Sequence, residues 1–422
     1  FVLKKSTVTH ESSSLTERDK NIRKLVNLQT GYWSVRAPLS PSRLNLSLPL
    51  IGIINNKVIY AHGSSLEPIE LFLPYVNMLR HILKDWKKRK MTFSGSWAAN
   101  IDRGDVSTSQ DYSDTVLSLV GSRPKHTRGV LWPNRFDALE FSSPGCGKDH
   151  DYDRKKFSNI PWEEREDTPF WRGSLTNGMD LELSRFEAYN DSTYVYHPFD
   201  FNPRPFLVRF SRLHPLLLDA AWTHIDAFED EHRKAIETHY GERAEFIPRE
   251  IYLTRYKYLF VIHGFGTAYR LRDHLASGLC SILHEGKFTE WYYPLLKPWV
   301  HYVPLREDMS NLESVLEWLK THPDKGRQIG RNARKFYLDY LTFENISNYV
   351  YHLGSRLALV EKYIDLDGIL QNSGTNFREF AEKDCGAGRT HDRIPAAVEF
   401  VEVRNRSKTN RSRVEYVRVV NF

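Results

Sequence analysis

The chain has 422 residues, of which 41% are hydrophobic, and it carries a formal net charge of +6. A chain of this length has room for two or three domains, each with its own core, so we expect a globular protein. The modest charge does not indicate a nucleic-acid partner, and no apolar run approaches the roughly 20 residues that a membrane-spanning helix needs. We therefore expect no nucleic-acid binding and no membrane span in this sequence.

The cysteines and the glycosylation sequons bear on the compartment. Cys146, Cys280 and Cys385 allow at most one disulfide and lack the spacing of metal ligands. Asn-x-Ser sequons, which suit a secretory protein, begin at Asn45, Asn190, Asn345, Asn405 and Asn410. The chain starts at Phe1 rather than Met, which is compatible with the removal of a signal or anchor segment. We expect the lumen of the secretory pathway, either endoplasmic reticulum or Golgi, rather than the cytosol.

The first third of the chain predicts a mixture of strands and long loops. Residues 1–45 are polar and are predicted to be a loosely packed leader. The run LPLIGIINNKVIYAHG predicts a β-hairpin that turns at Asn55 and Asn56. Apolar residues at helical spacing predict a helix over 68–90. From residue 100 to about 160 the chain is rich in Gly, Ser, Asp and Pro, so we expect long loops around one strand, GVLWP.

A βαβ unit is predicted after residue 250. YKYLFVIH (256–263) has the composition of a buried strand, GFG that of a tight turn, TAYRLRDHLASG that of a three-turn helix ending at Gly278, and CSILHE that of a second buried strand. Strand, helix and strand in this order favour a parallel sheet. Residues 250–340 are therefore expected to form half of a doubly wound α/β domain.

The segment LKPWVHYVPL (296–305) is predicted to be the next strand, because its prolines disfavour a helix. Its side chains would alternate between two faces, with Trp299, His301 and Val303 on one of them. SNLE (310–313) has the form of a capping box, which predicts the start of a helix.

Two further helices and a terminal hairpin complete the prediction. The helices are expected over 323–341 and 343–366. AVEFVEV and VEYVRVV then alternate apolar and polar residues, which predicts two strands joined by the basic stretch 404–413. A solvated loop is the favoured interpretation of that stretch, with a polyanion-binding patch as the alternative.

The segment HGFGTAYR has the composition of an anion-binding turn. Gly264 and Gly266 let the backbone approach a ligand, and the first amides of the following helix are expected to point outward. Arg270 lies within reach of phosphate oxygens. The alternative is a tight turn without a ligand, but a cation near a helix N-terminus is better explained when an anion is bound there.

A second basic turn follows the apolar pair Phe170 and Trp171. It consists of Arg172, Gly173 and Ser174, which are candidates for a further anion contact. The alternative is an ion pair of this arginine with one of the nearby acids, which are Glu163, Glu164 and Glu166.

Metal sites have only weak signals. The run DHDYD (149–153) lacks the Gly and Glu that a calcium loop requires at its sixth and twelfth positions, which excludes an EF-hand. Asp-x-Asp pairs, which metal-dependent sugar transferases use to hold a cation on a diphosphate, occur at Asp151/Asp153 and Asp365/Asp367. The chain has no HExxH, Gly-x-Ser-x-Gly or GxxxxGK[ST] motif, so zinc proteolysis, serine hydrolysis and P-loop phosphoryl transfer lack their signatures.

Four segments together resemble the capsule-associated glycosyltransferase family, which includes the Rumi-type protein O-glucosyltransferases. They are PWEEREDTPFWRGSLTNG, LSR, YKYLFVIHGFGTAYRLRDHL and EWYYPLLKPWVHYVPLREDMSNLESVLEWL, in this order between residues 161 and 319. The resemblance implies a glycosyltransferase-B fold, in which two Rossmann-like α/β domains face each other across a cleft. It also implies a UDP-sugar donor, glucose or xylose, inversion at the anomeric carbon, a glycan or protein acceptor, and no metal or other cofactor.

The same resemblance assigns domains and roles. The polar leader would span 1–45, the acceptor domain 46–175, the donor-binding domain 176–341, and an extension of helices and a β-hairpin 342–422. The residues that correspond to the family's UDP-binding positions are Arg172, Gly173, Ser174, Arg270 and Glu290, and the glycines before the arginine are Gly264 and Gly266. Asp137, in RFDALEF, is the predicted catalytic base. Family members carry Arg where this chain has His263.

Three other functions are compatible with the sequence. A metal-dependent transferase would use Asp151 and Asp153, and a carbohydrate-binding relative would keep the fold without turnover. A polyanion-binding protein would act through the basic stretch 404–413.

Overall fold

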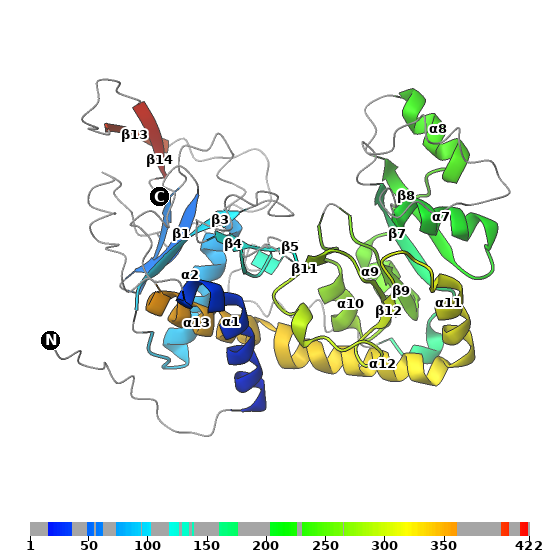
Figure 1. Ribbon diagram of the computed structural model, residues 1–422, viewed down its shortest axis with the longest axis horizontal. Helices are drawn as coiled ribbons and strands as arrows, with labels where there is room; N and C mark the ends of the chain where they lie inside the picture. The colour runs from blue at the N-terminus through cyan, green and yellow to red at the C-terminus, as the bar shows by residue number, and fades with distance from the viewer. Residues whose placement is uncertain are drawn as a thin grey trace.

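The computed structural model describes residues 16–35, 49–54, 56–61, 73–93, 95–102, 118–125, 129–134, 137–138, 160–175, 203–225, 230–264, 266–360, 398–404 and 414–420. Its strands and helices form two groups that lie side by side (Figure 1). One group is built on strands from the first third of the chain, and the other on strands from residues 170–305. The chain is thus a mixed α/β protein with parallel strands in both sheets.

The first sheet has the strand order β2-β1-β3-β4-β6. Its strands are β1 (Leu50–Ile54), β2 (Lys57–Ala61), β3 (Trp97–Asp102), β4 (Ser118–Val120) and β6 (Val130–Leu131). β1 pairs antiparallel with β2 and β3, whereas β3, β4 and β6 run parallel. The pairing of β1 with β2 confirms the predicted hairpin, and Asn56 in its turn takes a φ of +60°, which Asn tolerates better than most residues.

Three helices from opposite ends of the chain pack together on this sheet. They are α1 (Glu17–Val35), α2 (Leu73–Lys88) and α13 (Phe343–Val360), and α13 contacts the other two as well as β3. In α1 the side chains of Ile22, Leu25 and Val26 are buried in the core. The prediction of a loosely packed leader is therefore wrong for this helix, because apolar residues at positions i, i+3 and i+4 form one buried stripe on an otherwise polar helix.

The second sheet has the order β12-β10-β9-β7-β8, and all its strands are parallel. They are β7 (Phe170–Leu175), β8 (Asp219–Ile225), β9 (Tyr258–Val261), β10 (Cys280–His284) and β12 (Val303–Leu305). Numbered along the chain, this order is 2-1-3-4-5, which is typical of doubly wound sheets. The order reverses between β7 and β9.

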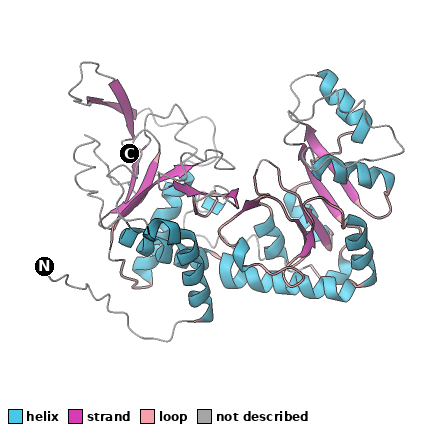
Figure 2. Ribbon diagram, viewed as in Figure 1, coloured by secondary structure: helices cyan, strands magenta, loops and turns pink. Residues whose placement is uncertain are grey.

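Helices cover both faces of this sheet (Figure 2). Phe260 and Ile282 pack in one core cluster with α7 and α11, while Val261 and Leu283 pack in another with α10 and α12. The helices of this group are α7 (Pro203–Leu213), α8 (Asp230–Tyr240), α9 (Arg249–Arg255), α10 (Leu271–Ser277), α11 (Leu312–Thr321) and α12 (Pro323–Phe336). Continuous burial of β9 and β10 explains why their sequences are apolar without alternation.

The predicted βαβ unit is confirmed, since β9 and β10 pair in parallel and α10 connects them. Gly278 ends α10 with a φ of +71°, a left-handed conformation that favours glycine. The helix is shorter than predicted, because it begins at Leu271. The chain before it turns instead, and the Leu271 amide donates to the carbonyl of Ala268 at 3.2 Å.

The segment 296–305 is only partly a strand, so this prediction is corrected. Residues 303–305 form β12, but the backbone of Trp299 takes a φ of +61° and its amide donates to the Tyr302 carbonyl at 2.7 Å. The resulting turn places the Trp299 ring edge-to-face against Trp318, with centroids 4.8 Å apart. The local hydrogen bonds and this ring contact replace the strand pairing that the alternating pattern had suggested.

The capping-box prediction is also corrected. α11 begins one residue later, after Asn311, whose side-chain oxygen accepts from the Arg306 amide at 2.9 Å. The amide of Ser310 donates to Asp308 at 3.0 Å, so Ser310 belongs to the preceding turn.

Short elements connect the two groups. β5 (Arg123–Pro124) pairs antiparallel with β11 (Phe288–Thr289), which joins the end of the first sheet to the loop after β10. Beyond α12, the π-helical turn η5 (Tyr337–Leu341) leads into α13 in the other group (Figure 1). β7 therefore lies in the second sheet and α13 packs with the first, although the predicted boundaries at 175 and 341 place them otherwise.

The remaining short elements are the 3-10 turns η2 (Trp162–Glu164) and η4 (Tyr293–Leu295), and the terminal strands β13 (Val398–Arg404) and β14 (Val414–Val420). The two terminal strands pair antiparallel, which confirms the predicted hairpin. The basic residues 405–413 between them lie outside the described residues. No helix in the described part of the chain is long and apolar enough to cross a membrane.

Among the sequons and cysteines that bear on the compartment, the structure describes Asn345 and Cys280. Asn345 is buried, and its side-chain amide donates to the Leu338 carbonyl at 2.8 Å and to the Thr342 hydroxyl at 2.9 Å. This sequon therefore cannot accept a glycan in the folded chain. Cys280 is a buried free thiol, and burial raises its pKa. The other sequons and cysteines lie outside the described residues.

Candidate functional site

The strands β7 and β9 separate toward their carboxyl ends. They form a single register pair, Phe170 with Leu259, at the beginning of both strands. Because the strand order reverses here, this is the position where doubly wound sheets hold their ligands, outside the carboxyl ends of the strands.

Two arginines occupy the opening between the strands. Arg270 donates from Nη1 to the backbone carbonyl of Arg172 at 2.5 Å. Arg204 donates from Nη1 to the carbonyl of Ser174 at 2.7 Å, and to the carbonyls of Ile262 and His263 at 3.0 and 3.1 Å. The carbonyls of residues 172 and 174 thus receive side-chain donors where a neighbouring strand would otherwise supply backbone amides.

The predicted basic turn at residues 172–174 is wrong, because these residues lie within strand β7. The Arg172 guanidinium donates to both carboxylate oxygens of Asp219, at 2.7 and 3.1 Å, and lies 4.5 Å from the centre of the Phe170 ring. Glu163 and Glu166 instead pair with Arg327 and Arg255. The alternative interpretation, an ion pair with a nearby glutamate, is therefore replaced by an ion pair with Asp219, and the Arg172 side chain is directed to the start of β8.

Gly173 and Ser174 form an irregular end to β7. The register with β8 shifts between these two residues. A Cβ on Gly173 would lie 2.6 Å from the ring of Trp171, which is fully buried, so only glycine fits. Such bulges are common next to active sites because they redirect a strand end.

The glycine turn after β9 uses its amides within the protein. The Gly264 amide donates to the Gly266 carbonyl at 3.1 Å, Thr267 to Ser122 Oγ at 3.4 Å, and Ala268 to His263 Nδ1 at 3.1 Å. The predicted outward-pointing amides at the start of a longer helix are therefore not observed at these three residues. The structure instead leaves the Arg270 side chain as the principal cationic contact that this turn contributes to the opening.

His263 is neutral because of where it lies. It is buried beside Arg204 and His284, and burial lowers its pKa to about 3. The neutral ring accepts a hydrogen bond from the Ala268 amide, and its centroid lies 5.9 Å from that of the His284 ring. His284 in turn contacts the Glu307 carbonyl through Nε2 at 2.9 Å. The two imidazoles thus fix the backbone around the ends of β9 and β10.

A second cluster of polar side chains lies where the two groups of elements meet. Asp137 forms an ion pair with Arg272 at 2.8 Å, and the two side chains are only 5% and 3% exposed. Asn134 donates to Glu290 at 2.8 Å and exchanges hydrogen bonds with Asp137. Burial, together with the negative charge of Asp137, raises the pKa of Glu290 to about 8. The predicted base and a predicted UDP contact therefore share one enclosed cluster.

This cluster adjoins the glycine turn. The hydroxyl groups of Thr267 and Tyr293 face the Glu290 carboxyl, and the Tyr293 ring lies 6.3 Å from that of His263. The structure thus brings Asp137, Glu290 and the turn that precedes Arg270 to one region.

Asn134, Arg204 and His284 were not among the site residues predicted from the sequence. Asn134 lies three residues before Asp137 in the same motif, which was a usable signal. His284 ends a predicted strand, where ligand-facing residues gather. No sequence motif marks Arg204, because its role depends on hydrogen bonds to carbonyls that are distant in sequence.

Metal ligands do not gather in the part of the chain that the structure describes: no three His, Cys, Asp or Glu side chains come together there. Both Asp-x-Asp pairs lie outside this part, so metal independence stays a prediction.

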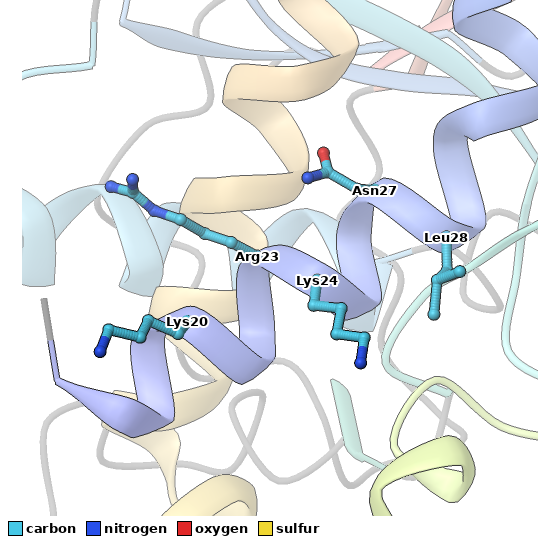
Figure 3. A pocket seen from close by; sticks show the side chains of 5 residues that line it. All are labelled: Lys20, Arg23, Lys24, Asn27 and Leu28. Atoms are coloured by element: carbon cyan, nitrogen blue, oxygen red, sulfur yellow. The ribbon is translucent and has the colours of Figure 1, made fainter.

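A surface hollow of about 480 Å³ lies along α1, away from the strand ends described above. Figure 3 shows its lining side chains, which are Lys20, Arg23, Lys24, Asn27 and Leu28. All of them come from one helix face, and none belongs to the predicted site.

Comparison with known proteins identifies a family and several relatives. Residues 150–364, about half of the chain, match the model of glycosyl transferase family 90. An uncharacterized protein, 179R, of Invertebrate iridescent virus 6 is 29% identical over 224 residues, which is 50% of this chain and 18% of the relative. Protein O-glucosyltransferase 1 of Mus musculus is 28% identical over 190 residues, 45% of this chain and 41% of the relative.

The O-glucosyltransferase rumi homolog of Aedes aegypti is 28% identical over 213 residues, 50% of this chain and 46% of the relative. The chain thus spans less than half the length of these relatives. The matched region contains the second sheet, residues 172–174, the glycine turn and Glu290. This chain belongs to glycosyl transferase family 90.

Proposed function

We propose that this chain is an inverting, metal-independent glycosyltransferase that moves glucose or xylose from a UDP-sugar to a hydroxyl group of a glycan or protein acceptor. The observation that carries the proposal is the arginine-lined opening between β7 and β9, at the reversal of strand order in a family 90 chain. The proposed architecture is two facing Rossmann-like domains, with the donor on the second sheet.

The diphosphate of the donor would lie against the glycine turn, where Arg270 supplies a fixed cation. Its hydrogen bond to the Arg172 carbonyl holds the guanidinium at the strand ends. As the bond between the anomeric carbon and the UDP oxygen breaks, negative charge develops on UDP, and a preorganised cation stabilises that charge. Arg172 contributes through its backbone carbonyl, because its side chain is held by Asp219.

The acceptor oxygen would attack the anomeric carbon from the face opposite UDP and release its proton to a carboxylate. Asp137 is the proposed base. In the structure this carboxylate is paired with Arg272, so its use as a base requires this ion pair to open when the acceptor binds. The burial of Asp137 in this ion pair also supports the alternative function, in which the chain binds sugars but does not catalyse transfer.

The first experiment is UDP release from a panel of UDP-sugars in EDTA, without acceptor. We expect slow release from one sugar. Arg270→Ala should weaken UDP binding about 10- to 150-fold, because a hydrogen bond to a charged group is worth about 1.5–3 kcal/mol. Arg331→Ala, which removes an exposed arginine on α12, is the matched control and should leave affinity unchanged.

The outcomes separate the candidate functions. Activity that is lost in EDTA and restored by Mn²⁺ would support the metal-dependent alternative. UDP binding without turnover, even with acceptors present, would support the non-catalytic relative. A chain that does not bind UDP at all would overturn the transferase proposal.

The proposed compartment is the lumen of the secretory pathway. The sequons at Asn45, Asn190, Asn405 and Asn410 support it, whereas the buried Asn345 does not. Expression in a secretory host followed by glycopeptide mass spectrometry would test it, and the absence of glycan at all four sites would count against it.

A further inference from the structure

Arg204 is a buried arginine whose guanidinium donates to three backbone carbonyls. It lies in the first turn of α7, its exposed fraction is 7%, and its guanidinium lies 5.8 Å from the centre of the Trp171 ring. Burial of a cation is costly unless its donors are satisfied. The hydrogen bonds to these carbonyls help to satisfy its donors.

The carbonyls that it contacts come from both sides of the opening. Ser174 ends β7, while Ile262 and His263 follow β9. Since β7 and β9 pair only at Phe170 and Leu259, nothing in their ladder fixes the distance between these strand ends. One guanidinium, with its donors in a rigid planar fork, spans the opening instead.

We propose that Arg204 is a positioning residue of the donor site: it fixes the separation of the carboxyl ends of β7 and β9, and so places the glycine turn and Arg270 for a nucleoside diphosphate. This inference rests on the proposed function. Arg204 would act through the backbone carbonyls that it holds.

A lysine cannot take over this role. Its ammonium group is a single point from which donors diverge, so it does not span carbonyls on two strands as a guanidinium does. Arg204→Lys therefore keeps the charge and removes the bridge. A loss of function in this variant would reflect geometry rather than charge.

Arg165 provides a matched control. It is equally buried, at 5% exposure, and donates to the carbonyls of Leu253 and Ser277 at 3.3 and 3.1 Å. These partners precede β9 and β10, so Arg165 joins elements at the opposite, amino-terminal end of the sheet. Arg165→Lys should cost a similar amount of thermal stability without disturbing the strand ends at the proposed site.

The test compares Arg204→Lys with Arg165→Lys by two measurements. Amide hydrogen exchange without ligand should become faster over residues 262–270 in Arg204→Lys only. UDP affinity, measured by calorimetry, should fall about tenfold in Arg204→Lys and stay unchanged in Arg165→Lys, as expected when positioning worth about 1.4 kcal/mol is lost.

Equal exchange and equal UDP affinity in the two variants would overturn the inference. Faster exchange without loss of UDP affinity would show that Arg204 orders the loop but does not serve the donor site. If the wild type does not bind UDP, the proposed function fails, and the exchange comparison alone decides whether Arg204 holds the strand ends. If Arg204→Lys does not fold, Arg204→Gln, which keeps an amide donor for one carbonyl, takes its place in both measurements.

Discussion

Replacing Asp137 with Asn separates a structural from a catalytic role for this carboxylate. The side chain pairs with Arg272 at 2.8 Å in an almost fully buried site, and Arg272 also donates to the Leu341 carbonyl at 2.8 Å. Asn keeps the size of the side chain but removes its charge, which leaves a buried cation without its counter-charge. Breaking a buried pair in this way costs about 3–5 kcal/mol.

The cost should appear as a large drop in thermal stability. A unit of 150–250 residues loses about 2–4 °C of melting temperature per kcal/mol, so Asp137→Asn should melt at least about 6 °C lower. The double variant Asp137→Asn/Arg272→Met leaves no buried charge. We expect the double variant to lose about 2–3 kcal/mol less unfolding free energy than the sum of the losses in Asp137→Asn and Arg272→Met.

The control is an ion pair of the same kind on the surface. Asp339 pairs with Lys335 one helical turn away, with the two side chains 41% and 75% exposed. Asp339→Asn should cost no more than about 0.5 kcal/mol. Calorimetric melting of Asp137→Asn, Arg272→Met, the double variant and Asp339→Asn measures these differences, and an unchanged melting temperature for Asp137→Asn would refute the reasoning. If Asp137 is also the base, turnover of the folded variant should fall by about 10²- to 10⁴-fold.

The remaining predictions concern a buried acid, two glycines and a sequon. Because burial raises the pKa of Glu290 from 4.5 to about 8, the folded chain keeps a proton that the unfolded chain releases, so this group's contribution to stability is lost as the pH rises from about 4.5 to 8. Glu290→Gln should flatten the fall of melting temperature over this range, and an unaltered slope would contradict the assignment. Gly330→Ala should destabilise the chain by about 1–3 kcal/mol, because the new Cβ in α12 would lie 2.3 Å from the Gly278 carbonyl oxygen. Gly31→Ala in α1 should instead stabilise the chain by about 0.5–1 kcal/mol, because its Cβ would meet no atom within 4 Å and alanine favours a helix. Urea unfolding measures both, and equal effects would refute the packing argument. Asn345 should carry no glycan after secretory expression, which mass spectrometry would check, and its occupancy would contradict the buried position.

Local sequence patterns predicted β9 and β10 of the second sheet well, but they did not predict β7 or β8. The apolar runs that became β9 and β10, and Gly278 between them, each depend on residues that are close in the chain. The same holds for the β1–β2 hairpin, where Asn56 supplies a left-handed turn. The patterns failed for α1 and for the turn at Trp299, since burial against α13 and contact with Trp318 are properties of the folded chain.

The residues of the site were likewise partly predictable from the sequence. Short motifs were sufficient to select residues 172–174, the glycine turn with Arg270, and Glu290, and their order along the chain indicated the family. They did not show that Arg172 is held by Asp219, that Asp137 is paired with Arg272, or that Arg204 bridges β7 and β9. Each of these contacts joins residues that are 30 or more positions apart, so it exists only when strand order and helix packing bring them together. The sequence by itself determined which chemical groups are present, and the tertiary structure decided which of them are already engaged by a partner and which face the opening at the strand ends.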